Sequence, residues 1–176
     1  MKNLALSLLF GILFVFSCNS FAYDEGDLTD LISSKSCGSM FSTCDLSSAR
    51  LVDLDLSNAD LEGVNLKNAY IENTKLSGAN LEGADLSGAT LKYVDLTGSV
   101  LADAKLVNTK FHLVDMSIAD IRDADIKGAA FVGVYLKQAK CDDVDFNQID
   151  TRLIDFSGAT GIKSGACEAS SYGECR

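Results

Sequence analysis

Cysteine and histidine are the residues whose chemistry this 176-residue chain could use most directly, and it contains six cysteines but one histidine. Two cysteines lie toward each end of the repetitive part of the chain and are disulfide candidates: Cys37, Cys44, Cys167 and Cys175. The simplest pairing joins Cys37 to Cys44 and the two C-terminal cysteines to each other, since each bond then closes a short loop. Cys141 is expected to be a buried free thiol. Free thiols at all four candidate positions are the alternative.

The other side chains form no pattern typical of an enzyme. The lone histidine, His112, leaves little material for a His-based metal site or a catalytic triad. The glycines of the central region recur at five-residue intervals and do not form a phosphate-binding loop. Fifteen basic against 25 acidic residues give a net charge of −10, which argues against direct binding to nucleic-acid phosphates. We therefore predict no enzymatic activity, no metal and no cofactor.

The N-terminal segment has the pattern of an export signal. Residues 4–16 carry no charge, and this run is shorter than the roughly 20 apolar residues that span a bilayer. Small residues at Ser20 and Ala22 favour cleavage before Tyr23, so we expect residues 1–22 to be a signal peptide. The alternative is a lipoprotein signal ending at Cys18, the one case in which we expect membrane anchoring. Cleavage before Tyr23 leaves a net charge of −11 and a periplasmic or secreted protein.

From residue 44 to residue 161 the chain repeats every five residues without an insertion or deletion. The repeat has 24 centres, from Leu46 to Gly161, and 13 of them are leucine. The residues two positions before each centre are mostly small or β-branched, and 12 are alanine. Neither column contains a charge, so both must face a dry interior. The expected core stack is Leu46, Leu66, Leu86, Leu106, Phe111, Phe131, Phe146 and Phe156.

The spacing of the inward columns predicts short extended segments joined by corners. Inward residues two apart, with an outward residue between them, have the geometry of a strand. The fifth position of the repeat is Gly, Asn or Asp in 16 of 24 units, and these residues accept left-handed turn conformations. Larger residues recur in the small column every 20 residues, as at Val94, Val114 and Val134. Four units therefore form one turn, and 24 units form about six coils.

Units such as Ala59-Asp60-Leu61-Glu62-Gly63 and Ala84-Asp85-Leu86-Ser87-Gly88 resemble the repeat of the pentapeptide-repeat proteins. The resemblance implies an all-β fold, a right-handed quadrilateral parallel β-helix. Residues 23–43 and 162–176 are expected to cap its ends, with a helical turn over 27–32 that begins at Asp27 as N-cap. The resemblance also implies an alternative function, because some family members mimic DNA and bind type II topoisomerases such as DNA gyrase. The export signal disfavours that alternative.

Sorting outward residues by the 20-residue period separates two surfaces. The acid wall comprises Asp60, Glu62, Glu82, Asp103, Asp120, Asp123, Asp142 and Asp143, with Arg122, Lys140 and Lys163 among them. It is interpreted as a solvated face or a weak cation site. The candidate contact face comprises Arg50, Tyr70, Lys92, Tyr93, Lys110, His112 and Arg152, together with Leu113, Val132 and Leu153. Aromatic and basic side chains together favour an acidic or sugar-bearing partner, while scatter among tolerant surface positions is the other interpretation.

These patterns predict a non-enzymatic, exported protein. Its rigid coil would serve as a structural or protein-interaction scaffold in the cell envelope or periplasm. We expect an unknown protein partner, no direct binding to nucleic acid, and either a monomer or an end-to-end dimer.

Overall fold

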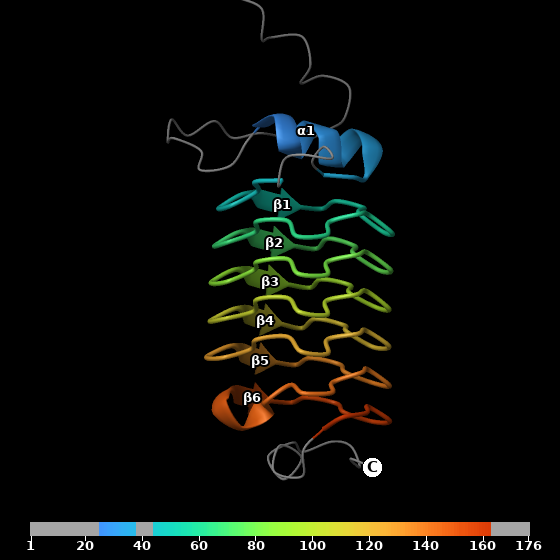
Figure 1. Ribbon diagram of the computed structural model, residues 1–176, viewed down its shortest axis with the longest axis vertical. Helices are drawn as coiled ribbons and strands as arrows, with labels where there is room; N and C mark the ends of the chain where they lie inside the picture. The colour runs from blue at the N-terminus through green and yellow to red at the C-terminus, as the bar shows by residue number, and fades with distance from the viewer. Residues whose placement is uncertain (1–24, 38–43, 163–176) are drawn as a thin grey trace, which may run out of the picture.

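The computed structural model describes residues 25–37 and 44–162, which form a rod of stacked coils closed at one end by a helix (Figure 1). Six three-residue strands lie in one parallel sheet, in sequence order. They are β1 (Arg50–Val52), β2 (Tyr70–Glu72), β3 (Thr90–Lys92), β4 (Lys110–His112), β5 (Ala130–Val132) and β6 (Asp150–Arg152). Each strand from β1 to β5 pairs with the residues 20 positions further along the chain, as Leu51 does with Ile71.

The other three sides of the coil repeat with the same period. Isolated parallel bridges join Asp55 to Lys75, Asp60 to Asn80, and Asn65 to Asp85. Four pentapeptides therefore complete one turn, which confirms the predicted parallel solenoid. Its right-handed sense and its total number of coils stay predictions.

Backbone hydrogen bonds between successive coils hold the rod together. The amide of Leu66 donates to the carbonyl of Asp85 in the next coil at 2.8 Å, and the amide of Asn65 donates to Cys44 in the preceding coil at 2.9 Å. Outward and central residues of each unit thus use their N–H groups in this ladder. A proline at either position would remove a donor, and the chain contains no proline.

The corners adopt the left-handed conformation that the fifth position predicts. Gly83 has a φ of 65°, and Asn58 and Asp103 each have a φ of 58°. Larger apolar residues also occupy such corners, including Tyr93 and Leu113. One unit departs from the pattern, because a short 3₁₀ helix, η1 (Phe146–Gln148), precedes β6.

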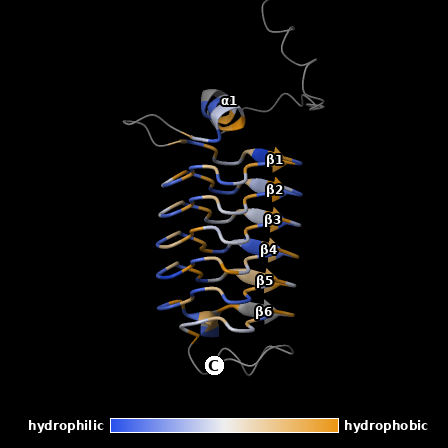
Figure 2. Cartoon of the chain, turned by 90° about the vertical axis from the view of Figure 1, so that its right-hand side faces the viewer, coloured by the Kyte–Doolittle hydropathy of each residue, from blue (hydrophilic) through white to orange (hydrophobic). Residues whose placement is uncertain are grey.

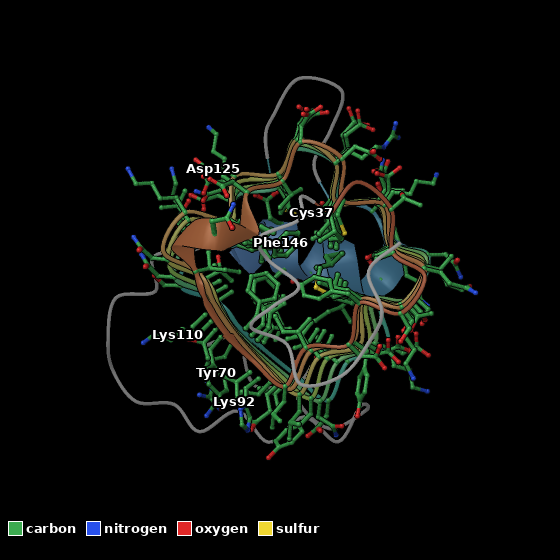
Figure 3. The ribbon with its side chains drawn as sticks, turned by 90° about the horizontal axis from the view of Figure 1, so that it is seen from below. Cys37, Tyr70, Lys92, Lys110, Asp125 and Phe146 are labelled. Carbon is green, nitrogen blue, oxygen red and sulfur yellow. A yellow bond between two sulfur atoms is a disulfide. The ribbon has the colours of Figure 1, made fainter. Side chains whose placement is uncertain are left out.

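The interior is a continuous column of apolar side chains, and Figure 3 shows Phe146 inside the coil. All eight residues of the expected core stack are 3% exposed or less. The ring of Phe131 stacks on that of Phe111 at 4.6 Å between centroids. Burying one such side chain contributes about 1.5–3 kcal/mol. Buried hydroxyl groups find backbone partners, as Thr109 does by donating to the carbonyl of Leu86 at 2.8 Å.

Helix α1 (Glu25–Ser34) covers the first coil (Figure 2). Leu28 and Leu31 of this helix are buried. Asp27 lies inside the helix, so its expected role as N-cap is wrong. Its carboxylate instead accepts a hydrogen bond from the amide of Asp45 at 2.7 Å. The docked helix thus supplies an acceptor to the first coil of the described rod.

The chain after α1 occupies one place that a preceding coil would take. Ser36 forms a parallel bridge with Asp60, and the amide of Asp60 donates to the carbonyl of Lys35 at 2.8 Å. A disulfide joins Cys37 to Cys44, with 5.4 Å between the Cα atoms. Cys141 is buried and free, and burial raises the pKa of its thiol to about 12.

Several expectations lie outside the described residues. They are the signal peptide with Cys18, the C-terminal cap after residue 162, and the pairing of Cys167 with Cys175. Within residues 25–37 and 44–162, no helix is long and apolar enough to cross a membrane.

Candidate interaction surface

The parallel sheet brings most residues of the candidate contact face together. The middle residue of each strand from β1 to β5 is buried, and its two neighbours point outward. We call the outward residues of β1–β5 the sheet face: Arg50, Val52, Tyr70, Glu72, Thr90, Lys92, Lys110, His112, Ala130 and Val132. In Figure 3 Tyr70, Lys92 and Lys110 project from this side of the coil, and Asp125 projects from another.

Two cations lie against one aromatic ring at the centre of β1–β3. The guanidinium carbon of Arg50 is 4.6 Å from the centroid of the Tyr70 ring, and the Nζ atom of Lys92 is 5.4 Å from it. Arg50 is directly paired with Tyr70 in the sheet, and Lys92 lies in the next strand. Each such contact contributes about 0.5–1 kcal/mol at an exposed site. The contacts favour orientations in which the two cations lie over the Tyr70 ring.

A pair of aromatic rings lies where β3 and β4 end. The rings of Tyr93 and His112 meet edge to face, with 5.9 Å between centroids and an interplanar angle of 74°. Tyr93 remains 54% exposed, so a partner can contact much of its side chain. Lys110 is exposed in the same strand as His112. Arg152 belongs to β6, where its backbone pairs with that of Val132.

The sheet face has the opposite charge to the protein as a whole. It contains the cations Arg50, Lys92 and Lys110 and one acid, Glu72. The complete chain has a net charge of −10. This surface can therefore attract acidic groups.

The acid wall is not uniformly negative. Asp120 binds the guanidinium group of Arg122 at 2.7 Å, and the ammonium group of Lys140 lies 3.6 Å from the same carboxylate. The hydrogen bond from Arg122 lowers the pKa of Asp120. Glu62, Glu82, Asp103, Asp123, Asp142 and Asp143 are exposed. Lys163 lies outside the described residues.

The sequence did not single out two features beside the sheet face. Tyr135 is 46% exposed on the adjoining side of the coil; an aromatic residue at an outward position usually taken by Asp or Asn was the available signal. A hollow of about 440 Å³ also opens next to Tyr93, lined by Asp53, Leu54, Asp55, Asn73, Thr74, Lys75, Tyr93 and Asp95. The shape of this hollow depends on how side chains pack at the corner that follows the strands, and the spacing of the repeat does not specify that packing.

The arrangement is suited to contact by charge and aromatic surface. The described residues contain no group of three or more His, Cys, Asp or Glu side chains that could hold a metal ion.

Comparison with known families matches the repeat directly. The model for pentapeptide repeats, with eight copies, matches residues 39–78 and 79–117. Residues 39–117 of this chain are therefore pentapeptide repeats. The match covers the coils that contain β1–β4. It therefore includes the contacts of Arg50 and Lys92 with Tyr70 and the contact of Tyr93 with His112.

Several solved structures are similar to this pentapeptide-repeat protein. QnrB1, a plasmid-mediated fluoroquinolone resistance protein, is 12% identical, with 73% of this chain and 85% of that chain covered and a TM-score of 0.41. A pentapeptide-repeat protein from the thylakoid lumen of Arabidopsis thaliana is 26% identical, with 57% and 63% covered and a TM-score of 0.36. Rfr23 from the cyanobacterium Cyanothece is 17% identical, with 73% and 92% covered and a TM-score of 0.38. Among curated proteins, none matches this sequence.

Proposed function

We propose that this pentapeptide-repeat protein is an exported, non-enzymatic scaffold that binds a protein partner through its sheet face. Pentapeptide-repeat proteins are generally structural or interaction scaffolds. The observation that carries the proposal is the placement of Arg50 and Lys92 against the half-buried ring of Tyr70, with Lys110 exposed on the same sheet face of an otherwise acidic rod. Such a surface suits an acidic protein, because complementary charge favours encounter while aromatic rings supply contact area.

The rigidity of the coil supports a scaffold role. Each residue of the sheet face is fixed by a strand whose backbone bonds to the coil before or after it. A surface that is already ordered loses little conformational entropy when a partner binds. A protein of this kind can present contacts on several coils at once.

Two observations support export to an oxidising compartment. The uncharged run over residues 4–16 followed by Ser20 and Ala22 is typical of a secretory signal. The disulfide between Cys37 and Cys44 is the kind of bond that persists outside the cytosol. The topoisomerase alternative is disfavoured by the same secretory signal, because an exported protein would not meet a cytosolic topoisomerase.

Export is tested by locating the native protein and sequencing its N-terminus. We expect a product in the periplasmic or secreted fraction that begins at Tyr23. A product that begins at a lipid-modified Cys18 would keep export but assign a membrane anchor. A cytosolic protein that retains residues 1–22 would contradict the proposal.

The role of the sheet face is tested by reversing its charge. Tagged wild-type protein is compared with the double variant K92E/K110E, and with K105E/K127E, which changes two exposed lysines on another side of the coil. We expect a specific protein to co-purify with the wild type and the control but to be lost from K92E/K110E. An unchanged set of co-purifying proteins would argue against the sheet face as the contact surface.

A further inference from the structure

Three large apolar side chains follow the sheet face along one corner of the rod. Tyr93, Leu113 and Leu153 come directly after β3, β4 and β6, and their exposed fractions are 54%, 45% and 60%. They are 20 or 40 residues apart, so they lie in one column. We call these three residues the corner ridge.

The corner ridge occupies backbone positions that do not favour its residue types. Tyr93, Leu113 and Leu153 have φ angles of 53°, 52° and 56°, a region in which residues other than Gly, Asn and Asp are strained. The same column contains Asp53 and Asn73, which accept this conformation more readily. An exposed leucine here therefore costs stability without filling the core.

Gly133 completes the column between Leu113 and Leu153. The Leu113 side chain covers this glycine, because a Cβ atom there would lie 2.7 Å from Leu113 Cδ2. The apolar surface therefore continues past the coil that lacks a large side chain. Val132, one residue earlier on the sheet face, borders the same stretch.

We propose that the corner ridge and the sheet face together seat an amphipathic helix of the partner, with its apolar stripe on the ridge and acidic side chains toward Arg50, Lys92 and Lys110. This inference rests on the proposed function and names the chemistry of the partner. Acidic groups suit the cations, and the ridge requires apolar contacts beside them. A purely acidic partner would leave the ridge uncovered.

The spacing of the coils favours a helix that lies along the rod axis. Stacked parallel strands are about 4.8 Å apart, and one helical turn rises about 5.4 Å. Side chains at i, i+4 and i+7 of a helix can therefore meet successive coils. A partner strand is disfavoured on this face, since the amides of the coils already donate to one another, as Lys110 does to Ala89 at 2.9 Å.

The direct test uses two synthetic 18-residue helical peptides as probes. Both have a leucine stripe, and they differ in having glutamate or lysine beside it. Fluorescence anisotropy measures their binding to the purified protein at low and high salt. We expect the glutamate peptide to bind at least tenfold more tightly than the lysine peptide, with an affinity that falls as salt rises.

The ridge is tested with the double variant L113N/L153N. Asparagine already occupies this corner at Asn73, with a φ of 49°, so the variant should fold and its melting temperature should rise. We expect binding of the glutamate peptide to fall at least tenfold. The matched control is I118N, because Ile118 is 58% exposed at a left-handed corner on another side of the coil. This control should bind as the wild type does.

Each other outcome overturns the inference. It fails if the glutamate peptide does not bind, if both peptides bind equally, or if L113N/L153N binds as the wild type does. Ridge-dependent binding to phosphatidylglycerol vesicles but not to the peptide would assign the surface to a lipid. Ridge-dependent self-association would assign it to a second copy of the chain. A native partner that is lost from K92E/K110E but retained by L113N/L153N would preserve the proposed function while contradicting the helix.

Discussion

Outward aspartates of the repeat bind the chain's own backbone. The carboxylate of Asp95 accepts a hydrogen bond from the amide of Thr97 at 2.9 Å, and Asp115 does the same with Ser117 at 2.9 Å. This local bond fixes the turn that follows each short extended segment. The Asp column therefore has a structural role in every coil where it recurs, which separates it from the residues that differ on the sheet face.

These hydrogen bonds make the stability of the folded protein depend on pH in the acid range. Hydrogen bonds from the Ser57 amide and hydroxyl, aided by Lys35, lower the pKa of Asp55 from its ordinary value of 3.8 to about 2. The Ser157 hydroxyl similarly lowers the pKa of Asp155. A lowered pKa in the folded state gives stability that is present above pH 3.8 and lost as pH falls toward 2.

We therefore expect the urea midpoint of unfolding to fall between pH 4 and pH 2. The variant D55N keeps an oxygen acceptor but does not titrate, so its midpoint should fall less over this range. Urea titrations followed by circular dichroism measure both. A wild-type midpoint that does not change below pH 4 would contradict this role of the carboxylates.

At the scale of elements, α1 and its disulfide close the first coil. Leu28 and Leu31 pack on the core, while Asp27 accepts the hydrogen bond of an amide in that coil. The cap thus covers apolar surface and also uses a backbone donor that would otherwise be left at the end of the solenoid.

Removing the disulfide should loosen this cap. We expect C37S/C44S to lose about 2–3 kcal/mol of unfolding free energy, because the bond closes a short loop in the unfolded chain. Hydrogen exchange should increase first at α1 and the first coil, while β4 and β5 remain protected. Equal acceleration along the whole rod would show that the cap is not a separate unit of stability.

The stacked phenylalanine side chains of the core are the other feature whose contribution to the unfolding free energy can be estimated. Phe131 is 0% exposed and stacks on Phe111. We expect F131A to lower the unfolding free energy by about 3–5 kcal/mol, because it leaves a cavity between coils. Chemical denaturation measures this loss. Val132→Ala on the sheet face is the control and should change stability by less than about 1 kcal/mol.

At the scale of the whole molecule, one hydrogen-bond ladder runs through every described coil. The amide of Val100 donates to the carbonyl of Ala79 at 2.9 Å. Ala102 instead follows Leu101 in a turn closed by the Ala104 amide on the Leu101 carbonyl at 3.1 Å, with Asp103 in the left-handed position. Proline is favoured at the second position of such a turn, which Ala102 occupies here.

We expect V100P to cost about 3 kcal/mol or more, and A102P to be neutral or stabilising by up to about 1 kcal/mol. Thermal unfolding of the two variants gives the comparison. Equal destabilisation would mean that the turn, and not only the ladder, excludes proline.

Much of the rod could be predicted from sequence because two charge-free columns and a 20-residue period admit few arrangements. The contact face could be grouped by the same period. The contacts of Tyr70 with Arg50 and Lys92 could not be predicted in this way, because they depend on the side-chain positions in neighbouring coils. The role of Asp27 depended on how α1 docks, and the spacing of a single helix does not determine that docking.

The account depends most directly on which side of the rod meets a partner. A photo-reactive amino acid can be placed in the native protein at Lys110 on the sheet face, and at Lys105 and Thr160 on two other sides, all exposed in the structure. The account predicts a discrete cross-linked protein from position 110 that is absent from 105 and 160 and is suppressed by K92E. Cross-linking of the same protein from 105 or 160, with none from 110, would contradict it.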